Sequence, residues 1–493
     1  MDKPAASTGH FRDIARKAVH GSLYSGSSAV ITAALGMLRL ILLARWVLPV
    51  HFGAFALALF YKVLTNRLFR FGFHQAMLNN QGPPEAIRPT YFSLCMAVGG
   101  IKLVLLLATA PLLQWLYPEV LHLSQLMVIF AGIALVETLN FVQEYTLRRH
   151  LKFDIIARIE VISLTAATIL APLAAWAGWG LWALMVEAAV ISFARFLLFW
   201  GPYKEWRPQF GWSPGVAREF VKFGKPFWLA INLSYLLDRF DDFWIGTFLG
   251  QTPLGYYSKA YDFSKTPRRV LGMPASNVFS SIFARLQQTP RQLSETFFQA
   301  QFLIIRLCLL ISGLFFLLMP EFIDHVIGKN WEPMLWTFRL LIIYIILDTP
   351  KTLIDTLLNA AGKPEAIRNA AIVQLIFFIP AVIGFASIAG INGVALAADL
   401  MLAIGLWRRF KPLRETVDFS LSKLAGWPLA ALLAATCGGL YLERSFAMPP
   451  LMNVLSKSGV FILMFIGILA GVEHAKYRSF IQNAIQLLKS NRP

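Results

Sequence analysis

Residues 297–318 read FFQAQFLIIRLCLLISGLFFLL, with Arg306 as the single charged residue. An α-helix needs roughly 20 apolar residues to cross a bilayer, so this stretch is long enough to span one. Similar stretches follow one another along almost the whole chain, in which 57% of 493 residues are apolar and only 15% are charged. Soluble domains are less apolar. The sequence therefore predicts an all-α polytopic membrane protein and excludes a soluble enzyme, a disordered chain and a disulfide scaffold.

Fourteen such stretches are expected to be transmembrane helices. They lie at about 20–43, 53–78, 90–112, 121–146, 155–176, 178–200, 226–249, 254–284, 297–318, 333–359, 367–388, 391–407, 424–442 and 451–472. The first stretch is too long for the core of a signal peptide. The three cysteines fall inside apolar stretches without the spacing of metal ligands, so we interpret them as small core residues.

Basic residues alternate between the two sets of connections that join these stretches. One set, together with both termini, holds 27 Lys and Arg residues, whereas the other set holds only Arg45, Lys329 and Arg444. Cytoplasmic loops of membrane proteins retain Lys and Arg, so the alternation supports fourteen helices and predicts that both termini are cytoplasmic. It also accounts for most of the net charge of +18, and nucleic acid is therefore not expected as a partner.

Three short matches relate the first half of the chain to the second. Residues 52–56 resemble 254–258, residues 146–158 resemble 356–368, and residues 180–184 resemble 393–397, at offsets that drift only from 202 to 213. A shift of six helices preserves orientation across a membrane, as parallel repeats require. We therefore expect two parallel six-helix lobes followed by two C-terminal helices. The predicted parts are a cytoplasmic segment (1–19), an N-lobe (20–200), a cytoplasmic linker (201–225), a C-lobe (226–410), two extra helices (411–472) and a cytoplasmic tail (473–493).

Several segments resemble the Wzx-type polysaccharide flippases of the multidrug/oligosaccharidyl-lipid/polysaccharide exporter superfamily. They are LARWVLP (43–49) running into Phe52 and Gly53, IGTFLG (245–250) running into LGYYSKA (254–260), IGKNW (327–331) and AAGK (360–363). The resemblance covers the first twelve predicted helices. It implies alternating-access transport of an undecaprenyl-pyrophosphate-linked oligosaccharide across the bacterial inner membrane, for O-antigen, capsule or exopolysaccharide. The implied partners are that glycan, membrane lipids, a polysaccharide polymerase and a chain-length regulator.

Cations inside the predicted helices are costly in hydrocarbon, so they should face a polar cavity, a partner charge or the interface. Two helices carry basic faces, one around Lys62 and Asn66 and a denser one that begins near Lys259. Guanidinium and ammonium groups suit a pyrophosphate, and tyrosine rings suit the faces of sugars. The predicted substrate-binding residues are Arg39, Arg67, Arg70, Tyr257, Lys259, Tyr261, Lys265, Arg268, Arg269 and Arg339.

Each of these residues has an alternative interpretation. The first basic face could reach the cytoplasmic headgroups, and the second could form an ion-pair ladder that holds the lobes together. Arg39 and Arg339 could form a cationic patch at the exit side, but Arg39 could equally bind lipid headgroups.

Carboxylates gather in three of the predicted helices. When repulsion and burial disfavour ionisation, a carboxylate gains proton affinity, so one of them could carry a coupling proton or help to bind sodium. The predicted ion-coupling or gating residues are Asp238, Asp241, Asp242, Asp262, Asp348, Lys351 and Asp355. A structural network is the alternative, with Asp348 and Lys351 as an intrahelical pair. The isolated charges are expected to pair within the bundle; these are Glu137, Glu187, Arg195, Arg306 and Asp399.

The chain contains no P-loop, HExxH or GxSxG motif, so an enzyme, a metal site or a cofactor is not expected. Energy would then come from a proton or sodium gradient. A peptidoglycan lipid-precursor flippase or a drug/cation antiporter is the alternative function, although the basic interior favours an anionic cargo. A lipid-linked glycosyltransferase or polymerase is disfavoured because the largest predicted exported loop, about 319–333, is short.

Overall fold

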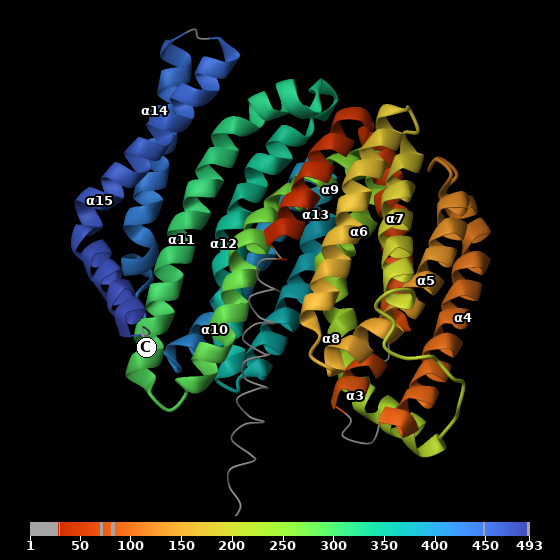
Figure 1. Ribbon diagram of the computed structural model, residues 1–493. Helices are drawn as coiled ribbons and strands as arrows, with labels where there is room; N and C mark the ends of the chain where they lie inside the picture. The colour runs from red at the N-terminus through yellow and green to blue at the C-terminus, as the bar shows by residue number, and fades with distance from the viewer. Residues whose placement is uncertain (1–27, 29, 70–71, 80–83, 447–448, 491–493) are drawn as a thin grey trace, which may run out of the picture. The chain divides into compact units, whose positions relative to one another are not determined.

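The computed structural model describes residues 28, 30–69, 72–79, 84–446 and 449–490. All regular secondary structure in these ranges is helical, which confirms the predicted all-α class (Figure 1). The predicted cytoplasmic segment 1–19, and Arg70 among the predicted site residues, lie outside the described residues.

The helices follow the apolar stretches of the sequence. In the first half, residues 30–46 are helical, followed by α2 (Pro49–Leu68), α3 (Phe73–Asn79), α4 (Pro84–Leu116), α5 (Leu123–Arg149), α6 (Phe153–Trp176), α7 (Leu181–Trp200) and α8 (Pro214–Trp244). The second half has α9 (Gln251–Ser264), α10 (Met273–Arg285), α11 (Pro290–Glu321), α12 (Met334–Ala360), α13 (Pro364–Arg414), α14 (Trp427–Ser445) and α15 (Pro450–Ser490). Helix α13 is broken at Ala389 and Gly390, between the two helices predicted there.

Short π-helical and 3₁₀ turns interrupt or extend several helices. They are η1 (Ile245–Leu249), η2 (Arg268–Gly272), η3 (Phe322–Ile327), η4 (Lys329–Trp331) and η5 (Ser422–Gly426). Turns of the π type are often found at functional sites, and η2 holds two of the predicted substrate-binding arginines.

Eight helical stretches in the described part of the chain are long and apolar enough to cross a membrane. They are Ile87–Leu116, Leu123–Arg149, Phe153–Trp176, Leu181–Trp200, Pro290–Ile327, Pro364–Arg414, Ser422–Ser445 and Pro450–His474. The protein is therefore a multi-pass membrane protein. The remaining predicted spans include α2, α8 and α12, which carry several of the predicted site residues. The count of fourteen spans and the arrangement of two parallel lobes stay predictions.

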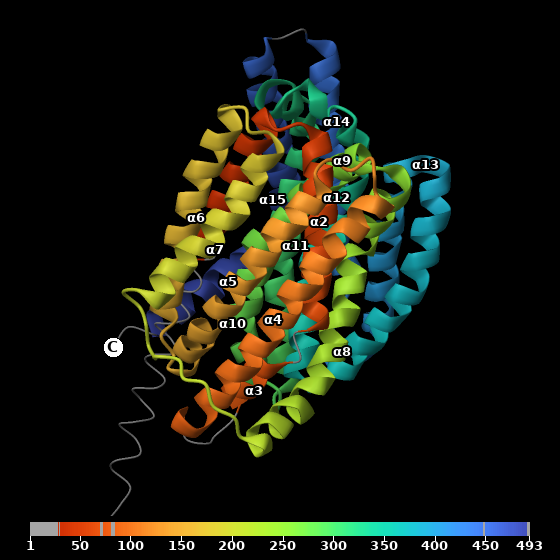
Figure 2. The ribbon, with the colours of Figure 1, turned by 90° about the vertical axis from the view of Figure 1, so that its right-hand side faces the viewer.

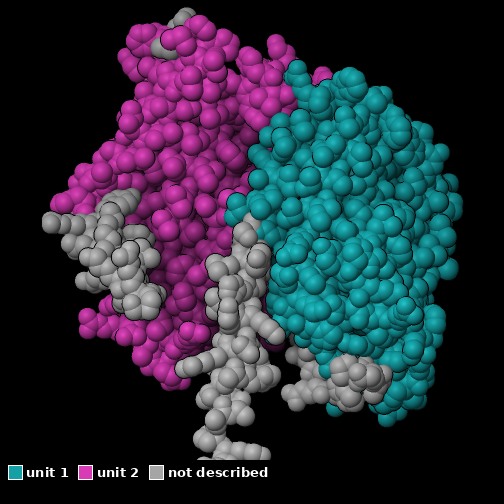
Figure 3. Space-filling view, in the orientation of Figure 1, with its two compact units in different colours: residues 1–259, 379–394 teal, residues 260–378, 395–493 magenta. Residues whose placement is uncertain are grey.

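The chain forms two compact units, which Figure 3 shows in different colours. Unit 1 comprises residues 1–259 and 379–394, and unit 2 comprises residues 260–378 and 395–493. Within unit 1, α4 lies against α5 and α6 lies against α7, as Figures 1 and 2 show from two sides. Within unit 2, α14 lies against α15 and α11 against α12. The domain boundaries predicted from the sequence stay a prediction.

The stretch predicted as a cytoplasmic linker, 201–225, is held against unit 1. Helix α8 begins at Pro214, so the second half of this stretch is helical. Three hydrogen bonds fasten the first half to α4 and α5: Gly211 N to Ser93 Oγ (3.1 Å), Ser213 N to Thr90 Oγ1 (3.0 Å) and Gln143 Nε2 to Trp206 O (2.8 Å). Its polar backbone groups thus find partners on the helices that it crosses.

Gly53 and Gly255, which are equivalent in the sequence repeat, lie near the starts of α2 and α9 in unit 1. Each of them lies against the backbone of the other helix. A Cβ atom on Gly53 would lie 1.6 Å from the carbonyl oxygen of Gln251, at the first residue of α9. A Cβ atom on Gly255 would lie 1.9 Å from the carbonyl oxygen of Pro49, at the first residue of α2. Only glycine permits such an approach of backbone to backbone. The local sequence match therefore has a shared physical cause.

Candidate functional site

A cavity of about 200 Å³ lies among α2, α3, α4 and α5 in unit 1. Three permanent cations line it, against one carboxylate. Its polar lining consists of Lys62, Asn66, Arg67, His74, Lys102, Glu137 and Thr138, and Phe73 and Phe141 are among its apolar walls. A concave surface with an excess of positive charge attracts anions, so the cavity suits an anionic group better than a cationic one.

The lysines of this cavity are held by partners on neighbouring helices. Lys62 Nζ donates to Glu137 Oε1 at 2.7 Å, and Lys102 Nζ donates to Thr138 Oγ1 at 3.0 Å. Both lysines are more than nine-tenths buried. Burying an ammonium group is costly unless hydrogen bonds or opposite charges compensate, so an anionic ligand would add a favourable contact here. The Arg67 guanidinium lies 5.6 Å from the centre of the Tyr235 ring.

Sequence reasoning identified only part of this cavity. Arg67 was a predicted substrate-binding residue and lines the cavity, whereas Lys102 and His74 were missed. Lys102 was visible as the only basic residue in the predicted span 90–112, and this signal could have found it. Arg39 lies elsewhere, paired with Glu187 at 2.8 Å.

The predicted basic stripe around α9 divides between the two units. In unit 1, the Tyr257 hydroxyl donates to Asp241 Oδ2 at 2.6 Å, and Lys259 Nζ lies 4.6 Å from the centre of the Phe52 ring. In unit 2, Tyr261 shares a hydroxyl hydrogen bond of 3.0 Å with Tyr344. Each of these groups has a partner in its own unit.

The rest of the stripe lies in unit 2. Lys265 Nζ lies 4.0 Å from the centre of the Tyr261 ring, and Arg269 pairs with Asp262 at 3.9 Å. The guanidinium of Arg339 lies on the aromatic rings of α11 and α12, 5.1 Å from the centre of Phe316. Each of these unit 2 cations has its own contact, and their role in binding stays a prediction.

The acidic cluster of α8 lies in unit 1, with one exposed and two buried carboxylates. Asp241 accepts the Tyr257 hydrogen bond, and Asp242 pairs with Arg239 at 2.5 Å, one turn before it. Asp238 is exposed. Their assignment to ion coupling stays a prediction.

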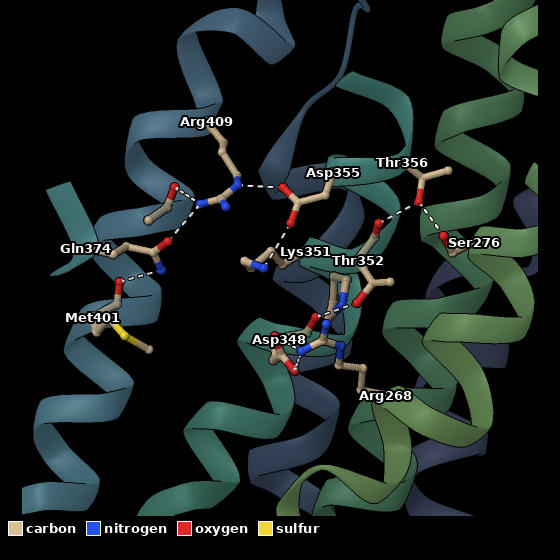
Figure 4. Close-up of polar contacts among 12 residues, drawn as sticks. Arg268, Ser276, Asp348, Lys351, Thr352, Asp355, Thr356, Gln374, Met401 and Arg409 are labelled. Atoms are coloured by element: carbon tan, nitrogen blue, oxygen red, sulfur yellow. Dashed lines mark hydrogen bonds and ion pairs between the residues drawn. The ribbon is translucent and has the colours of Figure 1, made fainter. Parts of the chain in front are cut away.

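A polar network joins η2, α12 and α13 in unit 2 (Figure 4). The predicted pair between Asp348 and Lys351 is wrong. Asp348 instead pairs with Arg268 at 3.2 Å, and Lys351 donates to Asp355 Oδ2 at 2.9 Å. The spacing of four residues brings Lys351 beside Asp355, and the long Arg268 side chain reaches Asp348 from another element, as Figure 4 shows.

A second cation, Arg409 of α13, also binds Asp355 (Figure 4). Arg409 Nε donates to Asp355 Oδ1 at 2.6 Å, and its Nη1 donates to the Gly405 carbonyl oxygen at 2.9 Å. Asp355 is therefore neutralised from both sides, by Lys351 and Arg409. The network holds three cations against two carboxylates, counting Arg268 and Asp348.

Four of the five isolated charges pair within their units as expected. Glu137 and Glu187 are described above, Arg195 pairs with Glu160 at 3.5 Å, and Arg306 pairs with Glu473 at 2.6 Å. The fifth expectation is wrong, because Asp399 has neither an ion pair nor a side-chain hydrogen bond among the described residues.

Comparison with known proteins shows relatives named for lipopolysaccharide biosynthesis and for teichuronic acid biosynthesis. The lipopolysaccharide biosynthesis protein WzxC of Escherichia coli (strain K12) is 23% identical over 396 residues, which cover 79% of each chain. The teichuronic acid biosynthesis protein TuaB of Bacillus subtilis (strain 168) is 24% identical over 297 residues, which cover 60% of this chain and 61% of TuaB.

Solved structures show the same fold at low identity. The lipid II flippase MurJ, in an inward closed conformation, matches with a TM-score of 0.71 and 15% identity, over 94% of this chain and all of MurJ. An inward-facing MATE family multidrug transporter of the MOP superfamily matches with a TM-score of 0.53 and 16% identity, over 81% of this chain and 96% of the transporter. These likenesses concern the fold alone.

The family match covers more than half of the chain. Residues 42–335 match the family described as polysaccharide biosynthesis protein. The family resemblance found in the sequence segments is thereby confirmed. This chain belongs to the polysaccharide biosynthesis protein family.

Proposed function

We propose that this protein is a flippase that carries an undecaprenyl-pyrophosphate-linked oligosaccharide across the bacterial inner membrane by alternating access. The glycan would then enter the assembly of O-antigen, capsule or exopolysaccharide. The protein would act as a transporter without chemistry of its own, with both termini in the cytoplasm and a proton or sodium gradient as the source of energy. A polysaccharide polymerase and a chain-length regulator would be its partners downstream.

The observation that carries this proposal is the cationic cavity of unit 1. A pyrophosphate bears two negative charges in its diester form, and the cavity offers Lys62, Arg67 and Lys102 against the single carboxylate of Glu137. Charge-assisted hydrogen bonds to phosphate oxygens are the strong ones, and ammonium and guanidinium groups provide them. The cavity is far smaller than a lipid-linked oligosaccharide, so it would hold the pyrophosphate alone.

The same observation weighs on the alternatives. A drug/cation antiporter of the same superfamily would need acidic or aromatic walls around its cargo, and the excess of cations disfavours it. A peptidoglycan lipid-precursor flippase would also bind a pyrophosphate, so the cavity does not distinguish it from a polysaccharide flippase. The identity of the transported glycan must come from the assay.

The test is translocation in liposomes that contain only this protein and a fluorescent undecaprenyl-pyrophosphate oligosaccharide. Outer-leaflet accessibility of the fluorophore reports flipping. Lys102→Met should reduce the rate at subsaturating substrate, because it removes one cation from the cavity. Lys102→Arg is the matched control, since it keeps the charge, and it should retain most of the activity.

Several outcomes would contradict the proposal. Equal rates for wild type and Lys102→Met, with both proteins folded by gel filtration, would remove the cavity from the path of the substrate. Failure of the folded wild type to flip any of several pyrophosphate-linked glycans, under proton and sodium gradients alike, would point to another cargo. Equally fast transport of the peptidoglycan lipid precursor would favour that alternative.

A further inference from the structure

Asp399 lies in the second half of α13, nine residues after the break at Gly390. At 1.5 Å per residue, this places it about 14 Å along the helix from the break. The hydrocarbon core of a bilayer is about 30 Å thick, so Asp399 lies near mid-membrane if the break marks one surface. The residue is only 5% exposed.

The carboxylate of Asp399 has no charged partner in the described part of the chain. Both of its oxygens are buried, and no side chain donates a hydrogen bond to either of them. The one polar group that reaches the carboxylate is the backbone N–H of Tyr344 in α12. The Tyr344 hydroxyl is itself engaged with the hydroxyl of Tyr261 in α9. On its own helix, the cation Arg409 is ten residues away and binds Asp355.

Other buried carboxylates of unit 2 are treated differently. Asp348 is paired with Arg268, Asp355 with Lys351 and Arg409, and Glu473 with Arg306. Burying an ionised carboxylate without a charged partner is costly, and such a group takes up a proton instead. The contrast within one unit therefore marks Asp399 as a group that binds a proton.

We propose that Asp399 is the proton-carrying group of this transporter. In the conformation described here it is a neutral carboxylic acid. In a conformation that admits water to it, the O–H bond breaks, the proton leaves to water and the carboxylate remains. Ionic residues inside membrane helices commonly serve such relays. The coupling of this step to transport rests on the proposed function, whereas the protonation itself does not.

Infrared difference spectroscopy on the full-length protein in liposomes at neutral pH tests the protonation without any transport. A protonated carboxyl group and a carboxylate absorb at clearly separate positions. Subtracting the spectrum of Asp399→Asn from that of wild type should reveal a protonated carboxyl band. The matched control is Asp348→Asn, which should reveal a carboxylate band because Asp348 faces Arg268. A carboxylate band for Asp399 would overturn the proposal.

Flipping under an imposed pH gradient tests the coupling. Wild type should be accelerated by the gradient, and Asp399→Asn, which imitates the neutral acid, should lose that acceleration. Asp399→Glu should retain it, because the acid is still present. Acceleration of Asp399→Asn equal to that of wild type would refute the role in coupling, even with the infrared band in place. A protonated band in a wild-type protein that flips nothing would leave the proton site standing and would refute the proposed function instead.

Discussion

Arg306 of α11 and Glu473 of α15 form an ion pair in which both side chains are almost fully buried, at 6% and 1% exposure. Arg306 Nε donates to Glu473 Oε2 at 2.9 Å, and its Nη2 donates to both carboxylate oxygens at 2.7 and 2.6 Å. A fourth hydrogen bond, of 2.8 Å, runs from Nη1 to the carbonyl oxygen of Phe302. Replacing Arg306 by Met would remove the guanidinium that pairs with the buried Glu473 carboxylate.

The magnitude follows from this geometry. Removing one partner of a buried ion pair typically costs about 3–5 kcal/mol, because the remaining charge is uncompensated. Arg306→Met should fall in this range, since all three charge-assisted hydrogen bonds disappear with the guanidinium. Replacing both partners by well-packed apolar residues is often neutral or stabilising by about 1–4 kcal/mol. The double variant Arg306→Met, Glu473→Met should therefore recover most of the lost stability.

Equilibrium unfolding by SDS in mixed micelles measures these free energies. The matched control is Arg195→Met, because the pair of Arg195 with Glu160 is longer, at 3.5 Å, and its side chains are 32% and 42% exposed. Exposed pairs contribute about 0–1 kcal/mol, so this variant should remain close to wild type. The reasoning fails if Arg306→Met costs no more than Arg195→Met, or if the double variant is at least as unstable as Arg306→Met alone.

Three further outcomes are expected. Burial tends to raise the pKa of Glu205, but hydrogen bonds from Lys152 and His150 outweigh it, so this pKa lies below its usual value. At neutral pH, Glu205→Gln should therefore be less stable than wild type. This difference should disappear as the pH falls through the folded-state pKa of Glu205, and thermal unfolding at a series of pH values would show it. Gly53→Ala should give little folded protein by gel filtration, because its Cβ would collide with a carbonyl oxygen, whereas Gly36→Ala, in open space, should fold normally. Asp355→Asn should destabilise the protein more in SDS titration than Asp262→Asn, because Asp355 is bound by two cations at 2.9 and 2.6 Å, whereas the ion pair of Asp262 with Arg269 is longer, at 3.9 Å.

The helices could be predicted because each apolar stretch carries its own reason to be helical in a membrane. The stretch 297–318 lies inside α11, and the observed helix extends beyond it at both ends because backbone hydrogen bonding continues past the apolar residues. The break of α13 at Ala389 and Gly390 falls between the two apolar stretches predicted there. Local composition determines these features, so they can be predicted without knowing which helices lie next to each other.

The partners of the charges could be predicted only in outline. Spacing along one helix suggested that Asp348 would pair with Lys351, but Asp348 is bound by Arg268, 80 residues away. A contact of this kind depends on which helix faces which, and hydrophobicity along the chain does not encode it. The same limit explains why Asp399 was expected to pair with another charge, whereas Lys102 could have been found from the sequence as the only basic residue of its predicted span.

The glycine crossing of α2 and α9 restricts how these helices can move against each other. Contacts between side chains can adapt, because rotamers change and absorb a displacement. At Gly53 and Gly255 there is no side chain to adapt, and the carbonyl groups of Gln251 and Pro49 lie directly against the opposite backbone. Sliding either helix along the other would bring a residue with a Cβ atom onto a carbonyl group. We therefore expect any movement of these two helices against each other to be a rotation about the glycines and not a translation along the helix axes.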